Sequence, residues 1–350
     1  MTKKETRHTT LYRAYRPQSF KEVHGQPQVV DVLAKAIQNK KIAHAYLFAG
    51  GRGTGKTSVA RILARELGVS DKDLYEIDAA SNTGVEHIRE LREGVHVTPF
   101  DSPYKFYIID EAHMLSRAAW NAFLKTLEEP PAHAIFVLAT TERDKIPETI
   151  QSRCEVYSFK QPTREVLAQV VEGVAKAEGY SLERAASELV ALLAEGSFRD
   201  ALSILQKVLA VSDNKKIEIE EVEAVSGAPR GEVVRQILSA IAKKEVSGAL
   251  KAIRSAVEEN VDPRTLAKLL IHRLRVVLLL RYAPDAAESF SHELTEGDLK
   301  LAKEIAKEPG INSDTLRALL EAYAQTAYAA VPHLPLELAV IDICTSSPSV

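Results

Sequence analysis

The stretch "LFAGGRGTGKTSVARILARELG", residues 47–68, decides the fold of the amino-terminal part of this chain. It joins a short apolar run to a glycine-rich loop, and an amphipathic pattern of helical period follows the loop. Gly50, Gly55, Lys56 and Thr57 occupy the spacing G-x-x-x-x-G-K-[ST]. In this motif the glycines let backbone N–H groups wrap around phosphates. The pattern therefore predicts a phosphate-binding loop between a strand and a helix.

Each position of the loop has an expected role. Lys56 is expected to reach the terminal phosphates of a nucleoside triphosphate, and Thr57 to ligate Mg²⁺. The helix that begins near Lys56 is expected to direct its positive end at the phosphates. The predicted nucleotide-binding residues of the loop are Gly50, Gly51, Arg52, Gly53, Thr54, Gly55, Lys56, Thr57 and Ser58.

A second motif, "FYIIDEAHML" at residues 106–115, places two carboxylates after an apolar strand. Asp110 is expected to hold Mg²⁺ through water, and Glu111 to polarise an attacking water. A kinase would need a base placed for a substrate hydroxyl instead. The second carboxylate therefore favours a hydrolase, with a metabolic P-loop kinase as one alternative.

Length and composition set wider limits on the fold and on the binding partners. The chain has 350 residues, of which 45% are hydrophobic and 27% charged, and this suits two or three globular domains. The formal charge of −3 excludes a global basic field that would attract nucleic acid. The start "MTKKETRHTT" is not a signal peptide, and the longest apolar run, "VVLLL" at residues 276–280, is too short for a membrane span.

Only two cysteines are present, Cys154 and Cys344. They are too few and too far apart for a disulfide framework or a four-ligand zinc site. We therefore expect a cytoplasmic protein without zinc and without a membrane role.

Five short apolar runs alternate with helical patterns up to about residue 160, which predicts a parallel sheet covered by helices on both faces. One of the intervening helices is expected at residues 117–129, with Ser116 as its N-cap. The strand pattern stops at Gln161, and helical periodicity continues from there. The predicted strands are residues 45–48, 74–77, 106–109, 135–138 and 156–159, and the predicted domains are 1–161, 162–225 and 226–344, with a disordered tail at 345–350.

Taken together, these motifs resemble the clamp-loader AAA+ ATPases of the bacterial DNA polymerase III gamma/tau family. The resemblance covers residues 12–210 most specifically. It is carried by "LYRAYRPQSFKEVHGQ", "GGRGTGKTS", "EIDAASNTGVEHIRELRE", "YIIDEAHMLSRAAWNAFLKTLEEPP", "LATTERDKIPETIQSRC" and "GSFRDALSILQ". It implies an AAA+ P-loop domain with a five-stranded parallel sheet, then a small helical lid domain and an all-α collar domain for oligomerisation.

The resemblance also implies roles for individual residues. Thr141, beside Thr140, matches the sensor that orients the lytic water, and Arg199 matches the second sensor on the lid. Arg153 in "SRC" resembles an arginine finger that acts in trans on the ATP of a neighbouring subunit. The segment that packs on the adenine is matched by Tyr12, Arg13, Arg16, Pro17 and Val23.

Function and partners follow from the same resemblance. It implies an ATP-driven motor subunit that uses ATP and Mg²⁺ to load a sliding clamp onto primer-template DNA, with no polymerase site of its own. The implied partners are delta-like and delta-prime-like subunits, further copies of the chain, the clamp and the DNA. One feature departs from the family. The usual four-cysteine zinc module is missing, because "ARELGVSDKDLYEIDAAS" crosses its position without a cysteine.

Other functions remain open from the sequence. They are a different AAA+ DNA-remodelling ATPase, such as a Holliday-junction helicase or an archaeal-type small clamp-loader subunit, and a clamp-loader scaffold with little hydrolysis of its own. For DNA contact, the helix start in "SNTGVEHIRELRE" offers N–H groups and cations to phosphates, but a solvated helix face explains these residues equally well. The candidate DNA residues are Asn82, Thr83, Arg89 and Arg92.

Overall fold

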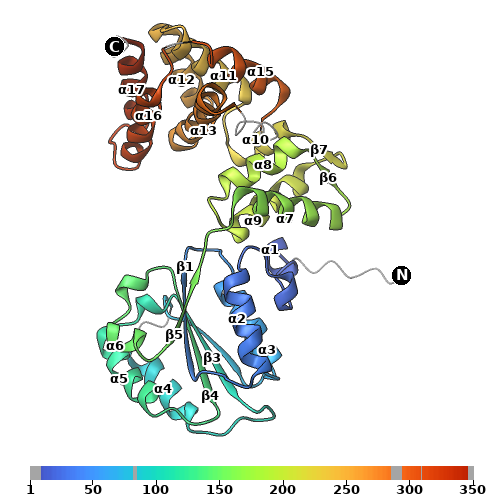
Figure 1. The fold of residues 1–350 in the computed structure, drawn as a ribbon, viewed down its shortest axis with the longest axis vertical. Coiled ribbons are helices and arrows are strands. Elements are labelled where there is room, and N and C mark those ends of the chain that lie inside the picture. The colour runs from blue at the N-terminus through green and yellow to red at the C-terminus, as the bar shows by residue number, and fades with distance from the viewer. Residues whose placement is uncertain (1–8, 82–84, 285–293, 309, 346–350) are drawn as a thin grey trace. The chain divides into compact units, whose positions relative to one another are not determined.

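A computed structural model describes residues 9–81, 85–284, 294–308 and 310–345. The chain divides into two compact units (Figure 1). The sheet unit comprises the described residues up to Val170 together with Ala194–Ser203, and the helical unit comprises Val171–Leu193 and the described residues from Ile204 onward.

The sheet unit is built on a parallel sheet in the order β2-β3-β4-β1-β5. This confirms the predicted α/β fold, and every expected strand is present. Its strands are β1 (Ala45–Gly50), β2 (Leu74–Asp78), β3 (Lys105–Asp110), β4 (Ala134–Thr140) and β5 (Glu155–Phe159). Its helical segments are α1 (Leu11–Ala14), η1 (Phe20–Glu22), α2 (Pro27–Gln38), α3 (Lys56–Glu66), α4 (Val85–Val95), η2 (Ala112–Met114), α5 (Arg117–Glu128), η3 (Arg143–Lys145) and α6 (Glu148–Gln151).

Helices cover both faces of this sheet, because alternate residues of each central strand enter different apolar clusters (Figure 1). In β1, Tyr46 and Phe48 pack with α2 and α3, whereas Leu47 packs with α4 and α5. The continuous apolar character of the strand thus follows from burial on both faces. As predicted, Ser116 caps α5: its hydroxyl accepts from the backbone N–H of Ala119 at 3.2 Å.

The amino edge of the sheet is held together by a buried carboxylate. Asp73 precedes β2 and is fully buried. It accepts backbone N–H groups of Phe100, Asp101 and Ser102 at 2.7, 3.1 and 3.0 Å. The segment before β3 is therefore tied to the start of β2, in the stretch that lacks the zinc-module cysteines.

The helical unit and the chain that enters it are almost entirely helical, as predicted. One detail of that prediction is wrong, because two short parallel strands, β6 (Ser181–Leu182) and β7 (Lys216–Ile217), pair after Gln161. Two-residue strands are too short to leave an alternating pattern in the sequence. The helices are α7 (Arg164–Ala177), α8 (Arg184–Leu193), α9 (Phe198–Val211), α10 (Ile219–Ser226), α11 (Gly231–Ala242), α12 (Val246–Glu258), α13 (Pro263–Tyr282), α15 (Glu296–Ile305), α16 (Ser313–Thr326) and α17 (Leu334–Thr345).

The three-domain division at residues 161 and 225 stays a prediction. Thr345, placed in the disordered tail from the sequence, ends α17, and residues 346–350 lie outside the described part of the chain. Among the described residues, no helix has both the length and the apolar character needed to cross a membrane.

Candidate functional site

The glycine-rich loop between β1 and α3 has a backbone that only glycine fits at two positions. Gly50 has φ +159°, and a Cβ there would lie 2.4 Å from the carbonyl oxygen of Phe159. Gly53 has φ +69°, and a Cβ there would lie 2.0 Å from the Ser197 hydroxyl oxygen. Any side chain is therefore excluded from both positions, so the backbone N–H groups of the loop stay accessible to phosphates.

Lys56 begins α3 and turns its ammonium group back into the loop. Its Nζ donates to the carbonyl oxygens of Gly50 and Gly51, both at 2.8 Å. Burial lowers the pKa of Lys56, while the charges of Glu111 and Asp110 act to raise it. A cation that is buried against carbonyl groups fits the binding of an anion such as phosphate.

The two expected metal ligands meet across the carboxyl edge of the sheet. Thr57 Oγ1 donates to Asp110 Oδ2 at 2.8 Å, although the residues are far apart in the chain. The other carboxylate oxygen of Asp110 accepts the backbone N–H of Glu111 at 3.0 Å. Mg²⁺ binds oxygen ligands and keeps several water molecules, so it is usually held by only one or two protein groups such as a hydroxyl and a carboxylate. These residues therefore fit a Mg²⁺ site.

Glu111 lies in a left-handed backbone conformation, with φ +47°. A non-glycine residue in this region stores local strain, which is typical of functional positions. The Thr141 hydroxyl donates to Glu111 Oε2 at 3.1 Å. β3 and β4 are neighbours in the sheet, so the loops that follow them bring these two residues together.

The start of the chain and the start of α9 meet at an aromatic contact. The Arg199 guanidinium carbon lies 4.9 Å from the centre of the Tyr12 ring, and that of Arg13 lies 5.8 Å from it. Phe198 also donates its backbone N–H to the carbonyl oxygen of Gly53 at 3.0 Å. The first turn of α9 is thus fixed to the glycine-rich loop, within the sheet unit.

The remaining candidates of the amino-terminal segment and of the glycine-rich loop differ in how far they are buried. Arg16 and Pro17 are half-buried between α1 and η1, and Val23 packs on the cluster beneath α2 and α3. Arg52 is exposed in the loop, Thr54 is buried, and Ser58 lies in the first turn of α3.

Arg153 lies at the opposite edge of the sheet from the glycine-rich loop. It precedes β5, which is parallel to β1, and Gly50 pairs with Phe159 at the far end of β5. Phe159 lies four residue steps after Glu155, which is about 13 Å at about 3.3 Å per residue. Arg153 is bonded instead to Glu128 Oε1 at 2.7 Å and to the Thr149 carbonyl at 2.6 Å.

The structure does not test the proposed DNA residues. Asn82 and Thr83 lie outside the described residues, as does the side chain of Arg89. Arg92 is half-buried in the last turn of α4. The DNA assignment therefore stays a prediction.

Sequence reasoning missed several polar side chains that hold this edge together. The buried Gln26 donates to the Lys160 carbonyl at 2.7 Å and to the Thr54 carbonyl at 3.3 Å, which connects the end of β5 with the loop. His113 lies beside Glu111, and Glu142 lies on the other side of the His113 ring. All three residues lie in the quoted motifs, His113 in "DEAH", Gln26 at the end of "LYRAYRPQSFKEVHGQ" and Glu142 in "LATTE", but the motifs gave no role for them.

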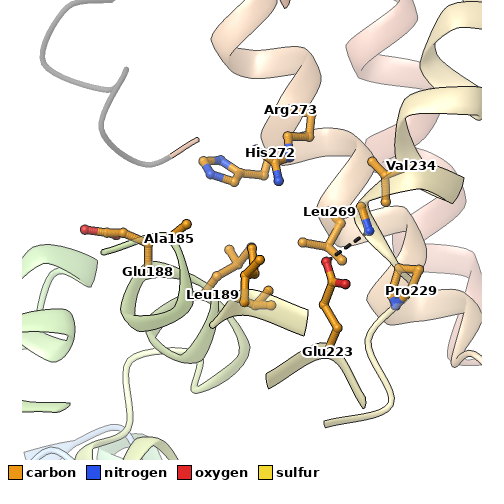
Figure 2. Close-up of a pocket in the computed structure, with 12 residues that line it drawn as sticks. Ala185, Glu188, Leu189, Glu223, Pro229, Val234, Leu269, His272 and Arg273 are labelled. Atoms are coloured by element: carbon orange, nitrogen blue, oxygen red, sulfur yellow. Dashed lines mark hydrogen bonds between the residues drawn. The ribbon is translucent and has the colours of Figure 1, made fainter. Parts of the chain in front are cut away.

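The helical unit contains a small cavity with several polar side chains in its lining, shown in Figure 2. Its lining comes from α8, α10, α11 and α13, and includes Glu188, Glu223, His272 and Arg273. Burial raises the pKa of Glu223, although its carboxylate accepts the Gly231 backbone N–H at 2.9 Å. The cavity volume is about 20 Å³, which is room for about one water molecule. It is too small for a nucleotide.

Comparisons with known proteins identify related families and a related fold. A family model described as DNA polymerase III, delta subunit, matches residues 25–83 and 69–163. A second, described as DNA polymerase III clamp loader subunit, ATPase lid domain, matches residues 166–214. Among solved structures, the Thermotoga maritima RuvB Holliday junction branch migration motor has a TM-score of 0.52 at 23% identity, over 65% of this chain and 79% of that chain. This likeness supports the AAA+ fold.

Two relatives match over most of the chain. DNA polymerase III subunit tau of Bacillus subtilis (strain 168) is 36% identical over 96% of this chain and 63% of that protein. DNA polymerase III subunit gamma/tau of Mycobacterium tuberculosis (strain ATCC 25618 / H37Rv) is 36% identical over 91% of this chain and 58% of that protein. The chain thus spans about three fifths of the length of these relatives. With its AAA+ fold and its matches to clamp-loader family models, the chain belongs to the DNA polymerase III gamma/tau family of clamp-loader subunits.

Proposed function

We propose that this chain is the ATP-driven motor subunit of a bacterial clamp loader. The observation that carries the proposal is the contact between Thr57 and Asp110 at 2.8 Å beside the buried Lys56. A phosphate-binding cation and two oxygen ligands for a metal are thereby assembled at the carboxyl edge of a parallel sheet, where ligands bind in open α/β folds.

In this proposal the loop and Lys56 bind the triphosphate of ATP. The backbone N–H groups of the loop face the phosphates, and the ammonium of Lys56 exchanges its carbonyl partners for phosphate oxygens. Thr57 and Asp110 would hold Mg²⁺, which when bound supplies charge compensation on the phosphates. Tyr12 and Arg199 contact each other next to Phe198, which is bonded to the same loop, and this suits contacts to the base and the phosphates.

Hydrolysis needs a base, and Glu111 is the candidate. Its carboxylate follows Asp110 directly and is positioned by the Thr141 hydroxyl. A carboxylate in this place orients a water and accepts its proton as the water attacks the terminal phosphate. Arg153 is too far from the loop of its own subunit, so we assign it to the ATP of a neighbouring subunit.

The use of this energy follows from the family. We propose that ATP binding tightens a ring of related subunits around an opened sliding clamp and primer-template DNA, and that hydrolysis releases them. The partners would be delta-like and delta-prime-like subunits and further copies of this chain. The absence of zinc stays a prediction, which metal analysis of the purified protein tests: one zinc per chain would contradict it.

Replacement of Glu111 by Gln tests the assignment. Glu111→Gln should bind ATP with unchanged affinity, because Lys56, Thr57 and Asp110 remain. Its hydrolysis rate should fall about 10²- to 10⁴-fold, the usual contribution of a general base. Nucleotide affinity and single-turnover hydrolysis would be measured for both proteins.

Glu66→Gln serves as the matched control, because Glu66 is exposed at the end of α3. It should hydrolyse ATP like the wild type. A Glu111→Gln variant that turned over ATP at the rate of this control would exclude Glu111 as the base.

A further inference from the structure

Two loops at the carboxyl edge must keep a fixed relation for Glu111 and Thr141 to meet. One loop follows β3 and carries Glu111, and the other follows β4 and carries Thr141. Backbone pairing between the two strands extends only to Ile109 and Leu138. Beyond this pair, side chains hold the loops in register.

His113 makes three of these contacts. Its side chain is only 7% exposed. Nδ1 lies 3.1 Å from Thr140 Oγ1 and 3.5 Å from Glu111 Oε2, and Nε2 lies 3.2 Å from Glu142 Oε1. One imidazole thus touches the catalytic candidate and both neighbours of Thr141.

The partners of the ring can exchange hydrogen bonds with both of its nitrogens. Glu142 offers a carboxylate oxygen, which only accepts, so Nε2 donates to it. The Thr140 hydroxyl oxygen accepts the backbone N–H of Glu142 at 3.0 Å and has a second lone pair and a hydrogen left for its hydrogen bond with Nδ1.

We propose that His113 is a positioning residue that locks the loop after β4 onto the loop after β3, and so sets where Thr141 holds Glu111. The proposal rests on the proposed ATPase function. The left-handed backbone of Glu111 makes such a lock necessary, because a strained conformation persists only when its surroundings fix it. His113 does not contact the loop that binds phosphates, so its role is in the rate and not in affinity.

The first test is His113→Ala, measured by ATP hydrolysis and by binding of a non-hydrolysable ATP analogue. The turnover number should fall about 10- to 100-fold, because small misplacements of a catalytic group have effects of this size. KM and analogue affinity should stay within about twofold. His133→Ala is the matched control: His133 contacts the carbonyl oxygen of Val95 at 2.9 Å, at the other edge of the sheet.

The second test separates positioning from general stability. In the Glu111→Gln background, His113→Ala should cause no further loss of rate, since its effect passes through Glu111. Glu142→Ala removes the exposed partner of His113 Nε2. It should also lower the turnover number. His113→Asn, which keeps a polar atom near the place of Nδ1, should recover part of the rate.

The outcomes distinguish the two proposals. If Glu111→Gln keeps full activity, the proposed function fails. If Glu111→Gln loses activity but His113→Ala and Glu142→Ala keep it, the positioning role of His113 is wrong. The role is equally wrong if His113→Ala lowers the rate by the same factor with Gln at position 111.

Discussion

The two edges of the parallel sheet carry their charged groups in opposite environments. At the carboxyl edge, Lys56 is 6% exposed and is bonded to its own loop. At the amino edge, the Arg153 side chain is 34% exposed and that of its partner Glu128 is 48% exposed. A buried charge left without any partner has a large desolvation penalty, whereas an exposed ion pair contributes about 0–1 kcal/mol.

Under the proposed function, this difference would let one subunit serve two sites. The carboxyl edge would bind the nucleotide of its own chain, because its groups are held by hydrogen bonds to one another. The amino edge presents a cation that a competing anion on another molecule can take over at little cost. Helix α5 connects the two, since it begins after Glu111 and ends at Glu128.

The largest effect should come from the amino edge. Arg153→Ala should keep the ATP affinity of the single subunit and lose hydrolysis stimulated by clamp and DNA, by about 10³-fold or more, the contribution of an arginine finger. Nucleotide affinity and stimulated hydrolysis of the assembled complex measure this. A loss of ATP affinity in the isolated subunit would mean that Arg153 contacts the ATP of its own subunit. The amino edge would then not serve a neighbouring subunit.

At the carboxyl edge, Lys56→Ala should weaken ATP binding about 100-fold or more, because charge-assisted hydrogen bonds to the phosphates disappear. Equilibrium binding of a fluorescent ATP analogue measures it, and circular dichroism checks that the fold remains. Normal affinity would contradict the loop assignment.

Mixtures of Lys56→Ala and Arg153→Ala sharpen both predictions. Each variant lacks a different half of a shared site, so mixed assemblies should recover some activity where an intact loop meets an intact Arg153. If the variants assemble together and no activity returns, Arg153 does not act across an interface.

Acidification should reveal the buried carboxylate at the amino edge. Burial by itself raises the pKa of Asp73, but hydrogen bonds from Phe100, Asp101 and Ser102 outweigh it and hold the pKa at about 2. A depressed pKa stabilises the fold above the unfolded value of about 3.9, and this stability is lost as the pH falls from about 4 through about 2.

Asp73→Asn should therefore be less stable at pH 7, by about 1–3 kcal/mol, because backbone donors lose a charged acceptor. Its unfolding midpoint should also change less than that of the wild type between pH 4 and pH 2. Urea unfolding across this range measures both, with the exposed Asp71→Asn as control. Parallel pH profiles for wild type and Asp73→Asn would refute the assignment.

The smallest effect is expected for Glu128→Gln. The exposed pair with Arg153 should contribute less than about 1 kcal/mol to stability. Arg153 keeps its bond to the Thr149 carbonyl, so stimulated hydrolysis should change less than about threefold. Thermal unfolding and stimulated hydrolysis measure these effects. A loss as large as that of Arg153→Ala would mean that Glu128 has a role beyond that of an exchangeable partner.

The sequence by itself determined the strands, the glycine-rich loop and the family. Strands buried on both faces are continuous apolar runs, and the loop has fixed spacing because its backbone closes around phosphates. These signals are local, so they can be read without the fold. The same reasoning identified Lys56, Thr57 and Asp110, whose chemistry is tied to their position in a motif.

Only the tertiary structure decided which side chains meet. The strand order brings the ends of β3, β4 and β1 side by side, and this joins Glu111 to Thr141 and His113 to Glu142. Gln26 contacts Lys160 across most of the sheet unit. Such contacts depend on pairing between distant segments, for which a single sequence carries no local pattern. Short β6 and β7 were missed for the same reason, because a two-residue strand is defined by its partner and not by its own residues.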